Sequence, residues 1–272
     1  MRWLALGLLW ASAASGAEIV RWMVTDFPPA FIVSGEEAGR GYGDQQIRVL
    51  VSLLPEFEHH IQTVTLTRAS FEAQHSDGVC VAQAVDSPDR RRSMIFSERS
   101  FAAASAQLVA AGANAGQYRR FQNDNGEIRL ELLLADDSKR GAISAARYYA
   151  GSIQELAAIS SAGNIERMMS EPQLFKLLQA GRVDYIFASP WELAFNERQY
   201  AMAFAALPVA GMPPIVSYHV ACFDGQLGRK VMSRINRALS RDEAWRSFLE
   251  PIRQWWDEAA FTAMMANMSD AH

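Results

Sequence analysis

Short apolar runs alternate with stretches of helical periodicity along most of the chain. The first run, residues 19–24, stops before Pro28 and Pro29, because proline cannot donate a hydrogen bond to a strand ladder. Residues 45–54 then carry apolar side chains at helical spacing, and Pro55 ends that pattern. Strand and helix signals in alternation are typical of an α/β protein.

The same patterns predict the later elements. Strands are expected at residues 60–66, 79–85, 102–111, 142–145, 183–188 and 218–223. Helices are expected at residues 70–75, 148–156, 173–179, 228–239 and 242–256. Residues 112–126 read as a loop or a helix, and residues 128–134 as a helical turn or a strand.

The N-terminal segment has the pattern of a cleavable secretory signal peptide. Arg2 supplies a positive charge, residues 3–10 form a short apolar core, and small residues lead to Ala17. A membrane span needs about 20 apolar residues, so this core is too short, and the alternative is a buried N-terminal helix. We expect residues 18–272 to be exported as a soluble periplasmic protein without a lipid anchor, because no cysteine stands at the cleavage site.

Composition narrows the class of protein. Removal of the signal peptide leaves about 255 of the 272 residues, enough for one large domain or two small ones. Half of the chain is hydrophobic, which allows a sizeable core. The formal net charge of −4 argues against a dedicated nucleic-acid binder, which usually carries a basic surface.

The chain has two cysteines, Cys80 and Cys222. In an oxidising compartment they could form one disulfide. The alternative is a pair of buried free thiols, since cysteine is among the most buried residue types. Their spacing leaves both interpretations open.

Four blocks of sequence follow one another in an order that is informative about the family. A strand ending in TDFPPAF precedes the glycine-rich GRGYGD, and SPDRRRSMIFSERSF, LQAGRVDYIFASPWE and GRKVMSRINRAL follow. Together they resemble the bacterial extracellular solute-binding proteins of family 3, which serve polar amino-acid uptake. The resemblance extends over most of the mature chain.

This resemblance implies a two-lobed type II periplasmic-binding-protein fold. Each lobe would be a mostly parallel sheet flanked by helices, and two crossing strands would join the lobes. Lobe I would comprise residues 18–104 and 217–272, and lobe II residues 105–216. The ligand would lie in the cleft, with the lobes closing on it by a hinge. In this fold the strand of Cys222 returns beside that of Cys80, so a cross-strand disulfide becomes feasible.

The resemblance also implies ligand-binding residues in lobe I. Arg90 matches the arginine that pairs with a ligand carboxylate, because a guanidinium can bind a carboxylate with two hydrogen bonds. The alternative for Arg90 is a surface ion pair. Asp26 and Phe27 would face the cleft, and Phe27 and Tyr42 could form aromatic walls, although core packing explains Phe27 equally well. Gln83 offers the hydrogen-bonding side chain of its strand.

In lobe II the sequence departs from the amino-acid-binding pattern. Arg147 and Tyr148 stand at a predicted helix start, where an anionic group could bind. Ser189 occupies the position at which amino-acid binders carry an aspartate for the ligand ammonium, and a hydroxyl cannot offset a cation. Glu192 could substitute for that aspartate, or could cap a helix or face water, and Trp191 could supply a stacking face.

The predicted function is capture of a small polar, carboxylate-bearing ligand, an amino acid or a related molecule, for ABC-type uptake. An inner-membrane ABC permease is the expected partner, and a monomer without cofactor or metal is the expected form. The sequence contains no G-x-S-x-G, H-E-x-x-H or P-loop motif that would argue for catalysis. Two alternatives stay open, namely a dehydratase-like periplasmic enzyme on the same fold and a ligand sensor acting through a membrane partner.

Overall fold

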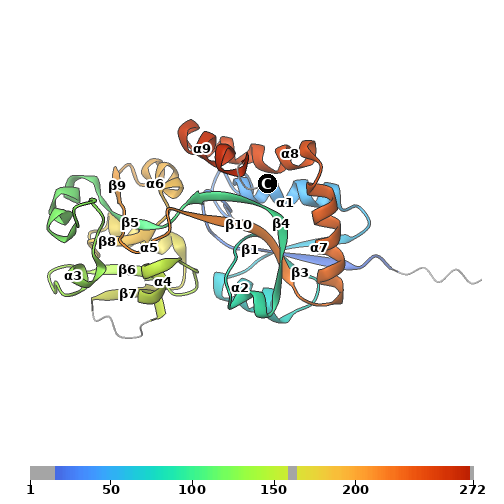
Figure 1. Ribbon diagram of the computed structural model, residues 1–272, viewed down its shortest axis with the longest axis horizontal. Coiled ribbons are helices and arrows are strands. Elements are labelled where there is room, and N and C mark those ends of the chain that lie inside the picture. The colour runs from blue at the N-terminus through green and yellow to red at the C-terminus, as the bar shows by residue number, and fades with distance from the viewer. Residues whose placement is uncertain (1–15, 159–163, 270–272) are drawn as a thin grey trace, which may run out of the picture.

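The computed structural model describes residues 16–158 and 164–269 as two lobes, each built on a five-stranded mixed sheet (Figure 1). The predicted signal peptide, residues 1–17, lies outside the described residues except for Gly16 and Ala17. Within the described ranges, no helix is both long and apolar enough to cross a membrane.

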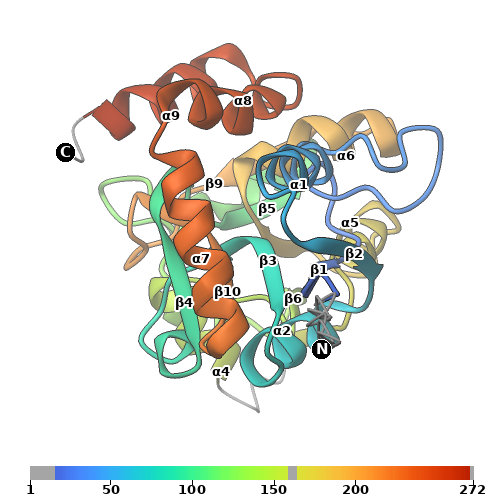
Figure 2. The same ribbon diagram turned by 90° about the vertical axis from the view of Figure 1, so that its right-hand side faces the viewer.

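The first sheet, in the order β2-β1-β3-β10-β4, forms lobe I. Its strands are β1 (Ile19–Val24), β2 (Glu58–Thr63), β3 (Val79–Val85), β4 (Met94–Ala104) and β10 (Ile215–Phe223). Its helices are α1 (Tyr42–Leu53), α2 (Leu66–His75), the 3-10 turn η1 (Arg90–Arg92), α7 (Gln226–Leu239), α8 (Asp242–Arg253) and α9 (Glu258–Ser269). Helix α7 packs along β4 and β10, as Figure 2 shows.

The second sheet, in the order β7-β6-β8-β5-β9, forms lobe II. Its strands are β5 (Gln107–Ala111), β6 (Gly141–Ser144), β7 (Ile165–Met168), β8 (Tyr185–Ala188) and β9 (Phe204–Leu207). Its helices are η2 (Gly112–Phe121), α3 (Leu130–Leu134), α4 (Gly151–Ala158), α5 (Glu171–Gln179), η3 (Pro190–Glu192) and α6 (Leu193–Tyr200).

The two lobes are joined through β4 and β10, the crossing strands that the resemblance implied (Figure 1). These strands pair antiparallel, with Ile215 opposite Ala104 at one end and Phe223 opposite Met94 at the other. The sheets are less parallel than expected. Strands β1, β2 and β3 pair in parallel, as do β6, β7 and β8, but β10 and β5 each run antiparallel to both of their neighbours.

Two predicted elements need correction. The apolar run 102–111 is not one strand, because β4 ends at Ala104 and β5 begins at Gln107 in the other sheet. The helix expected at 148–156 begins only at Gly151, whose positive φ of 50° turns the chain just before it. Side chains before that turn are therefore held by a loop, and they include Arg147 and Tyr148.

The predicted disulfide between Cys80 and Cys222 is confirmed. The two residues lie opposite each other on antiparallel β3 and β10, with their Cα atoms 4.1 Å apart. Both are fully buried in the core of lobe I. The bond thus ties the returning strand β10 to the centre of the first sheet.

Candidate functional site

The loop after β1 packs closely against the start of α1. The glycine-rich turn permits this, because a side chain at Gly41 would collide with the Ala30 carbonyl and one at Gly43 with the Phe31 ring. The backbone amide of Gly43 donates to the Ala30 carbonyl at 2.7 Å, which fixes the helix start against the loop. Tyr42 is held by its own backbone bond to the Pro29 carbonyl at 3.2 Å, and Phe27 by backbone bonds with Phe31 at 3.0 and 2.9 Å.

Arg90 lies on η1 at the edge of lobe I that faces lobe II. Its Nη1 donates to the carbonyl oxygen of Val85 at 2.9 Å, and its guanidinium carbon lies 5.2 Å from the ring centroid of Tyr148 in lobe II. Burial lowers the pKa of Arg90 from its ordinary value. The side chain is therefore a partly buried cation at the junction of the lobes.

Unlike Arg90, its two neighbours on the same turn form ion pairs with aspartates. Arg91 forms an ion pair with Asp86, and Arg92 forms one with Asp89 at 2.8 Å. Arg90 takes part in none of the ion pairs found within the described ranges, 16–158 and 164–269. The alternative of a surface ion pair thus fits Arg91 and Arg92 and does not describe Arg90.

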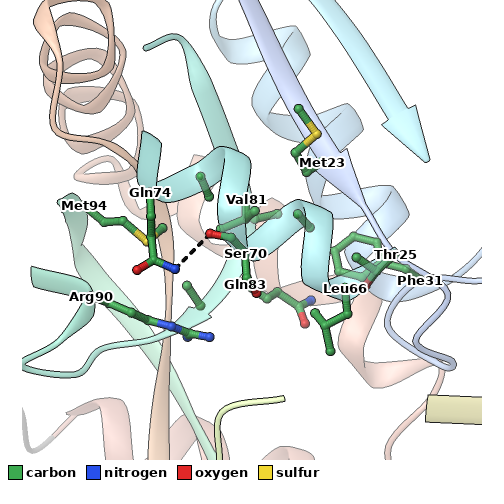
Figure 3. A pocket seen from close by; sticks show the side chains of 14 residues that line it. Met23, Thr25, Phe31, Leu66, Ser70, Gln74, Val81, Gln83, Arg90 and Met94 are labelled. Carbon is green, nitrogen blue, oxygen red and sulfur yellow. Dashed lines mark hydrogen bonds between the residues drawn. The ribbon is translucent and has the colours of Figure 1, made fainter. Parts of the chain in front are cut away.

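A cavity of about 80 Å³ lies beside Arg90, beneath α2 (Figure 3). Gln83 of β3 also lines it, and its Nε2 donates to Oε1 of Gln46 on α1 at 2.7 Å. The remaining lining residues are mostly apolar or small: Met23, Thr25, Phe31, Leu66, Ala69, Ser70, Ala73, Gln74, Val81, Ala82, Ala84 and Met94. The cavity is therefore lined by apolar and small side chains together with five polar ones, Arg90, Gln83, Thr25, Ser70 and Gln74.

Arg147 is held by two carboxylates within lobe II. Its Nη1 lies 3.2 Å from Glu171 Oε2 and its Nη2 lies 2.8 Å from Glu192 Oε1, and all three side chains are at most 8% exposed. Burial alone would lower the pKa of Arg147, but the charges of Glu192 and Glu171 raise it well above its ordinary value. Burial raises the pKa of Glu171 despite the opposing charge of Arg147. The guanidinium predicted as an anion site thus already has two anionic partners.

Ser189 and Glu192 belong to the same buried network. The backbone amide of Ser189 donates to Glu192 Oε1 at 2.7 Å, and Arg147 Nη2 donates to the Ser189 hydroxyl at 3.0 Å. Glu192 therefore caps the turn η3, which is one of the roles expected for it from the sequence. It also pairs with Arg147. This arrangement engages the carboxylate that could have met a ligand ammonium.

Trp191 of lobe II packs into an aromatic group on lobe I. Its ring centroid lies 6.1 Å from that of Trp256, stacked, 5.9 Å from that of Tyr42, and 5.7 Å from that of Phe27. Phe27 also lies under Arg147, with its centroid 5.0 Å from the guanidinium carbon. Phe27, Tyr42 and Trp191 are thus brought together in one aromatic cluster that spans both lobes.

Asp26 lies apart from Arg90, facing the helices of lobe II. Burial raises its pKa, while a hydrogen bond from the Val33 backbone and the charge of Lys176 act in the opposite direction. Asp26 is absent from the lining of the cavity beneath α2. The predicted site residues therefore fall into two groups: Arg90 with Gln83 and Tyr148, and the Arg147 network with the aromatic residues that Phe27 joins to it.

Three residues of this region escaped the sequence analysis. Glu171 begins α5 and looks like an ordinary acidic residue of a first helical turn. Tyr149 is fully buried, and its hydroxyl accepts from the Ser144 amide at 3.2 Å. Trp256 is the last residue of the helix expected at 242–256 and belongs to none of the four blocks. In the part of the chain that the structure describes, no group of three or more His, Cys, Asp or Glu side chains could hold a metal ion.

Comparisons with known proteins place the fold. No protein-family model matches the sequence, and no curated protein matches it. Solved structures do match. A mutant of ArgBP from T. maritima is 16% identical with a TM-score of 0.65, over 88% of this chain and 95% of that one.

Two further solved structures are similar to this chain over most of its length. A substrate-binding protein of an amino acid ABC transporter from Streptococcus pneumoniae, bound to L-arginine, is 12% identical with a TM-score of 0.62, over 93% of this chain and 94% of that one. A histidine kinase sensor domain with similarity to periplasmic binding proteins is 18% identical with a TM-score of 0.64, over 89% and 96%. Together with the two mixed sheets and the crossing strands, these likenesses show that the chain has the two-lobed type II periplasmic-binding-protein fold.

Proposed function

We propose that this protein captures a small carboxylate-bearing solute between its lobes and presents it to an inner-membrane ABC permease. The observation that carries the proposal is the absence of a carboxylate partner for Arg90. This side chain is partly buried at the junction of the lobes, and it pairs with no carboxylate among the described residues. A partly desolvated cation without a counter-ion is unfavourable, so a bound anion would stabilise it.

The geometry around Arg90 suits a carboxylate. A guanidinium presents a planar set of donors, and only Nη1 is engaged by a backbone carbonyl, that of Val85. Tyr148 covers the guanidinium from the other lobe, so a ligand at this point would contact both lobes. Gln83 adds a polar group from the neighbouring strand.

The other predicted residues receive supporting roles. Phe27, Tyr42 and Trp191 would form the apolar walls that meet when the lobes close, with Asp26 at their edge. The remaining three residues, Arg147, Ser189 and Glu192, would form a buried floor together with Glu171, in which one guanidinium faces two carboxylates. The same proposal includes lobe limits at residues 104/105 and 216/217. It also includes export to the periplasm and a monomeric state.

The solved structures support a binding role and leave a second candidate. Two similar structures are described as substrate-binding proteins of amino acid ABC transporters. One other is a histidine kinase sensor domain, and another is the periplasmic VFT2 domain of Bordetella pertussis BvgS. A sensor would use the same capture step but would pass the signal to a membrane kinase. Co-purification with a permease or with a kinase separates these two roles.

A ligand screen by thermal shift tests the proposal. Amino acids and organic acids are added to the purified protein, and binding raises the melting temperature by mass action. Arg90→Gln should lower the affinity for the best ligand by roughly 10- to 100-fold, the range for losing a charge-assisted hydrogen bond. Arg92→Gln removes an exposed charge from the same turn and is the matched control. Equal affinity of the wild type and Arg90→Gln would refute the proposal.

A further inference from the structure

Trp191 of lobe II lies in a socket of lobe I that three separate elements build. Phe27 follows β1, Tyr42 begins α1 and Trp256 follows α8. Their ring centroids lie 5.7, 5.9 and 6.1 Å from that of Trp191. Trp191 is only 7% exposed and belongs to the same buried apolar cluster as Tyr42 and Trp256, with Phe27 packed against it. The core of lobe I therefore extends across the lobe boundary into lobe II.

Helix α6 continues this contact one turn further along lobe II. The ring centroid of Phe195 lies 5.9 Å from that of Trp255, and the guanidinium carbon of Arg198 lies 5.9 Å from the centroid of the same Trp255 ring. Phe195 and Arg198 are three residues apart, so they lie on one face of the helix. Lobe II thus presents η3 and α6 together to the segment that follows α8 in lobe I.

The lobes also meet on the side of Arg147. The guanidinium carbon of Arg147 lies 5.0 Å from the ring centroid of Phe27 in lobe I. Where Arg147 and Ser189 meet Val85 and Tyr218 of the first sheet, a pocket of about 10 Å³ is left, which is about the volume that one water needs. At this point the lobes therefore pack directly on each other through their own side chains.

Moving the lobes apart would expose aromatic rings to water. Aromatic side chains bury large apolar areas, and returning such area to water is unfavourable. The contacts of Arg147 and Arg198 with the rings of lobe I would be lost as well. Six aromatic residues thus form a latch that favours the closed arrangement: Phe27, Tyr42, Trp191, Phe195, Trp255 and Trp256.

We infer that this aromatic latch keeps the two lobes together without a bound solute, and that a solute enters only when the latch opens. The inference goes beyond the proposed function, because it concerns what closes the lobes, whichever molecule is captured. The contacts that favour closure belong to the chain itself, so weakening them should open the free protein.

Small-angle X-ray scattering of the solute-free mature protein tests the inference. The protein is unfolded in urea, dialysed and refolded, so that no co-purified solute closes the lobes. We expect the wild type to give the scattering curve calculated from the closed structure. Trp191→Ala should increase the radius of gyration, because the ring that fills the socket is lost. A wild type that is already open, or a folded Trp191→Ala variant with the wild-type curve, would overturn the inference.

Trp245→Ala is the matched control for that change. Trp245 is also 7% exposed, but it stacks on Phe248 and lies under Arg99, and all three residues belong to lobe I. Its loss should leave the radius of gyration unchanged. An equal expansion in Trp191→Ala and Trp245→Ala would overturn the inference, because it would reflect a general loosening of lobe I and not the opening of a latch.

Phe195→Ala keeps the test decisive if Trp191→Ala does not fold. Phe195 is only half-buried on α6, so its loss disturbs the core less, and circular dichroism confirms that the variant is folded. Its radius of gyration should exceed that of the wild type, and an unchanged radius would overturn the inference. Since no ligand is added, these outcomes leave the carboxylate proposal for Arg90 to its own binding measurements.

Discussion

The guanidinium carbon of Arg90 lies 5.2 Å from the ring centroid of Tyr148, and the two residues belong to different lobes. Arg90 is fixed on lobe I by η1 and by its hydrogen bond to Val85. Tyr148 is carried by the loop between β6 and α4 of lobe II. Because this contact joins the two lobes, we expect lobe opening to break it and ligand capture at Arg90 to be linked to closure.

The first prediction concerns this contact. Tyr148→Ala removes the ring from Arg90, and a cation–π contact contributes about 0.5–2 kcal/mol. If closure and binding are coupled, affinity for the carboxylate ligand should fall by roughly 2- to 30-fold, measured by titration calorimetry. Tyr148→Phe keeps a ring and should bind nearly as the wild type does. Equal losses in both variants would mean that the hydroxyl matters and the ring does not.

The second prediction concerns the buried network. Arg147→Met leaves Glu171 and Glu192 buried without their cation, and removing one partner of a buried pair typically costs about 3–5 kcal/mol. Urea unfolding should show this loss of free energy of unfolding.

The triple variant Arg147→Met, Glu171→Gln, Glu192→Gln is the matched control for that change. It removes the uncompensated charges together with the cation, so much of the lost stability should return. A triple variant no more stable than Arg147→Met would show that the packing of the guanidinium against Phe27 and Tyr149 matters more than charge balance.

The elements predicted well from sequence are those whose periodicity is strong. Helices α7 and α8 alternate buried and exposed positions over three turns or more, and the expected ranges 228–239 and 242–256 nearly coincide with them. Strands β7 and β9 were not predicted, because four residues at a sheet edge are too few for an alternation to stand out.

The site was only partly predictable for a different reason. The position of Arg90 follows from a local pattern around β3 and β4, which a single sequence can reveal. The partners of Arg147 come from α5 and η3, 24 and 45 residues further along the chain. Nothing local indicates that Glu171 and Glu192 meet the same guanidinium, since only the sheet order brings their loops together.

The third prediction concerns acid stability. Asp77 accepts hydrogen bonds from the backbone amides of Leu227 and Gly228 at the start of α7, at 3.0 and 2.8 Å. Burial by itself would raise the pKa of Asp77, but these bonds lower it below its ordinary value of 3.8. A lowered folded-state pKa means that the stabilisation is present above about pH 4 and is lost as the pH falls through the folded-state pKa.

Asp77→Asn tests this sign. At neutral pH the variant should be less stable by about 0.3–1 kcal/mol, because a negative charge at a helix N-terminus is lost. The difference should vanish once the wild-type carboxyl is protonated. Asp124→Asn changes an exposed aspartate in lobe II and serves as the control. A difference between wild type and Asp77→Asn that does not vary with pH would show that shape, not charge, is what α7 requires.

The last prediction concerns the bond between Cys80 and Cys222. It closes a loop over a sequence separation of 142, which contains all of lobe II, and so restricts the unfolded chain strongly. The double variant Cys80→Ala, Cys222→Ala should lose about 2–5 kcal/mol of free energy of unfolding, measured with urea. Both sulfurs lie in the core of lobe I and neither residue lines the cavity beside Arg90, so the affinity of the folded variant should stay unchanged. A stable variant with weakened binding would instead mean that the bond positions β3, which carries Gln83, for the ligand.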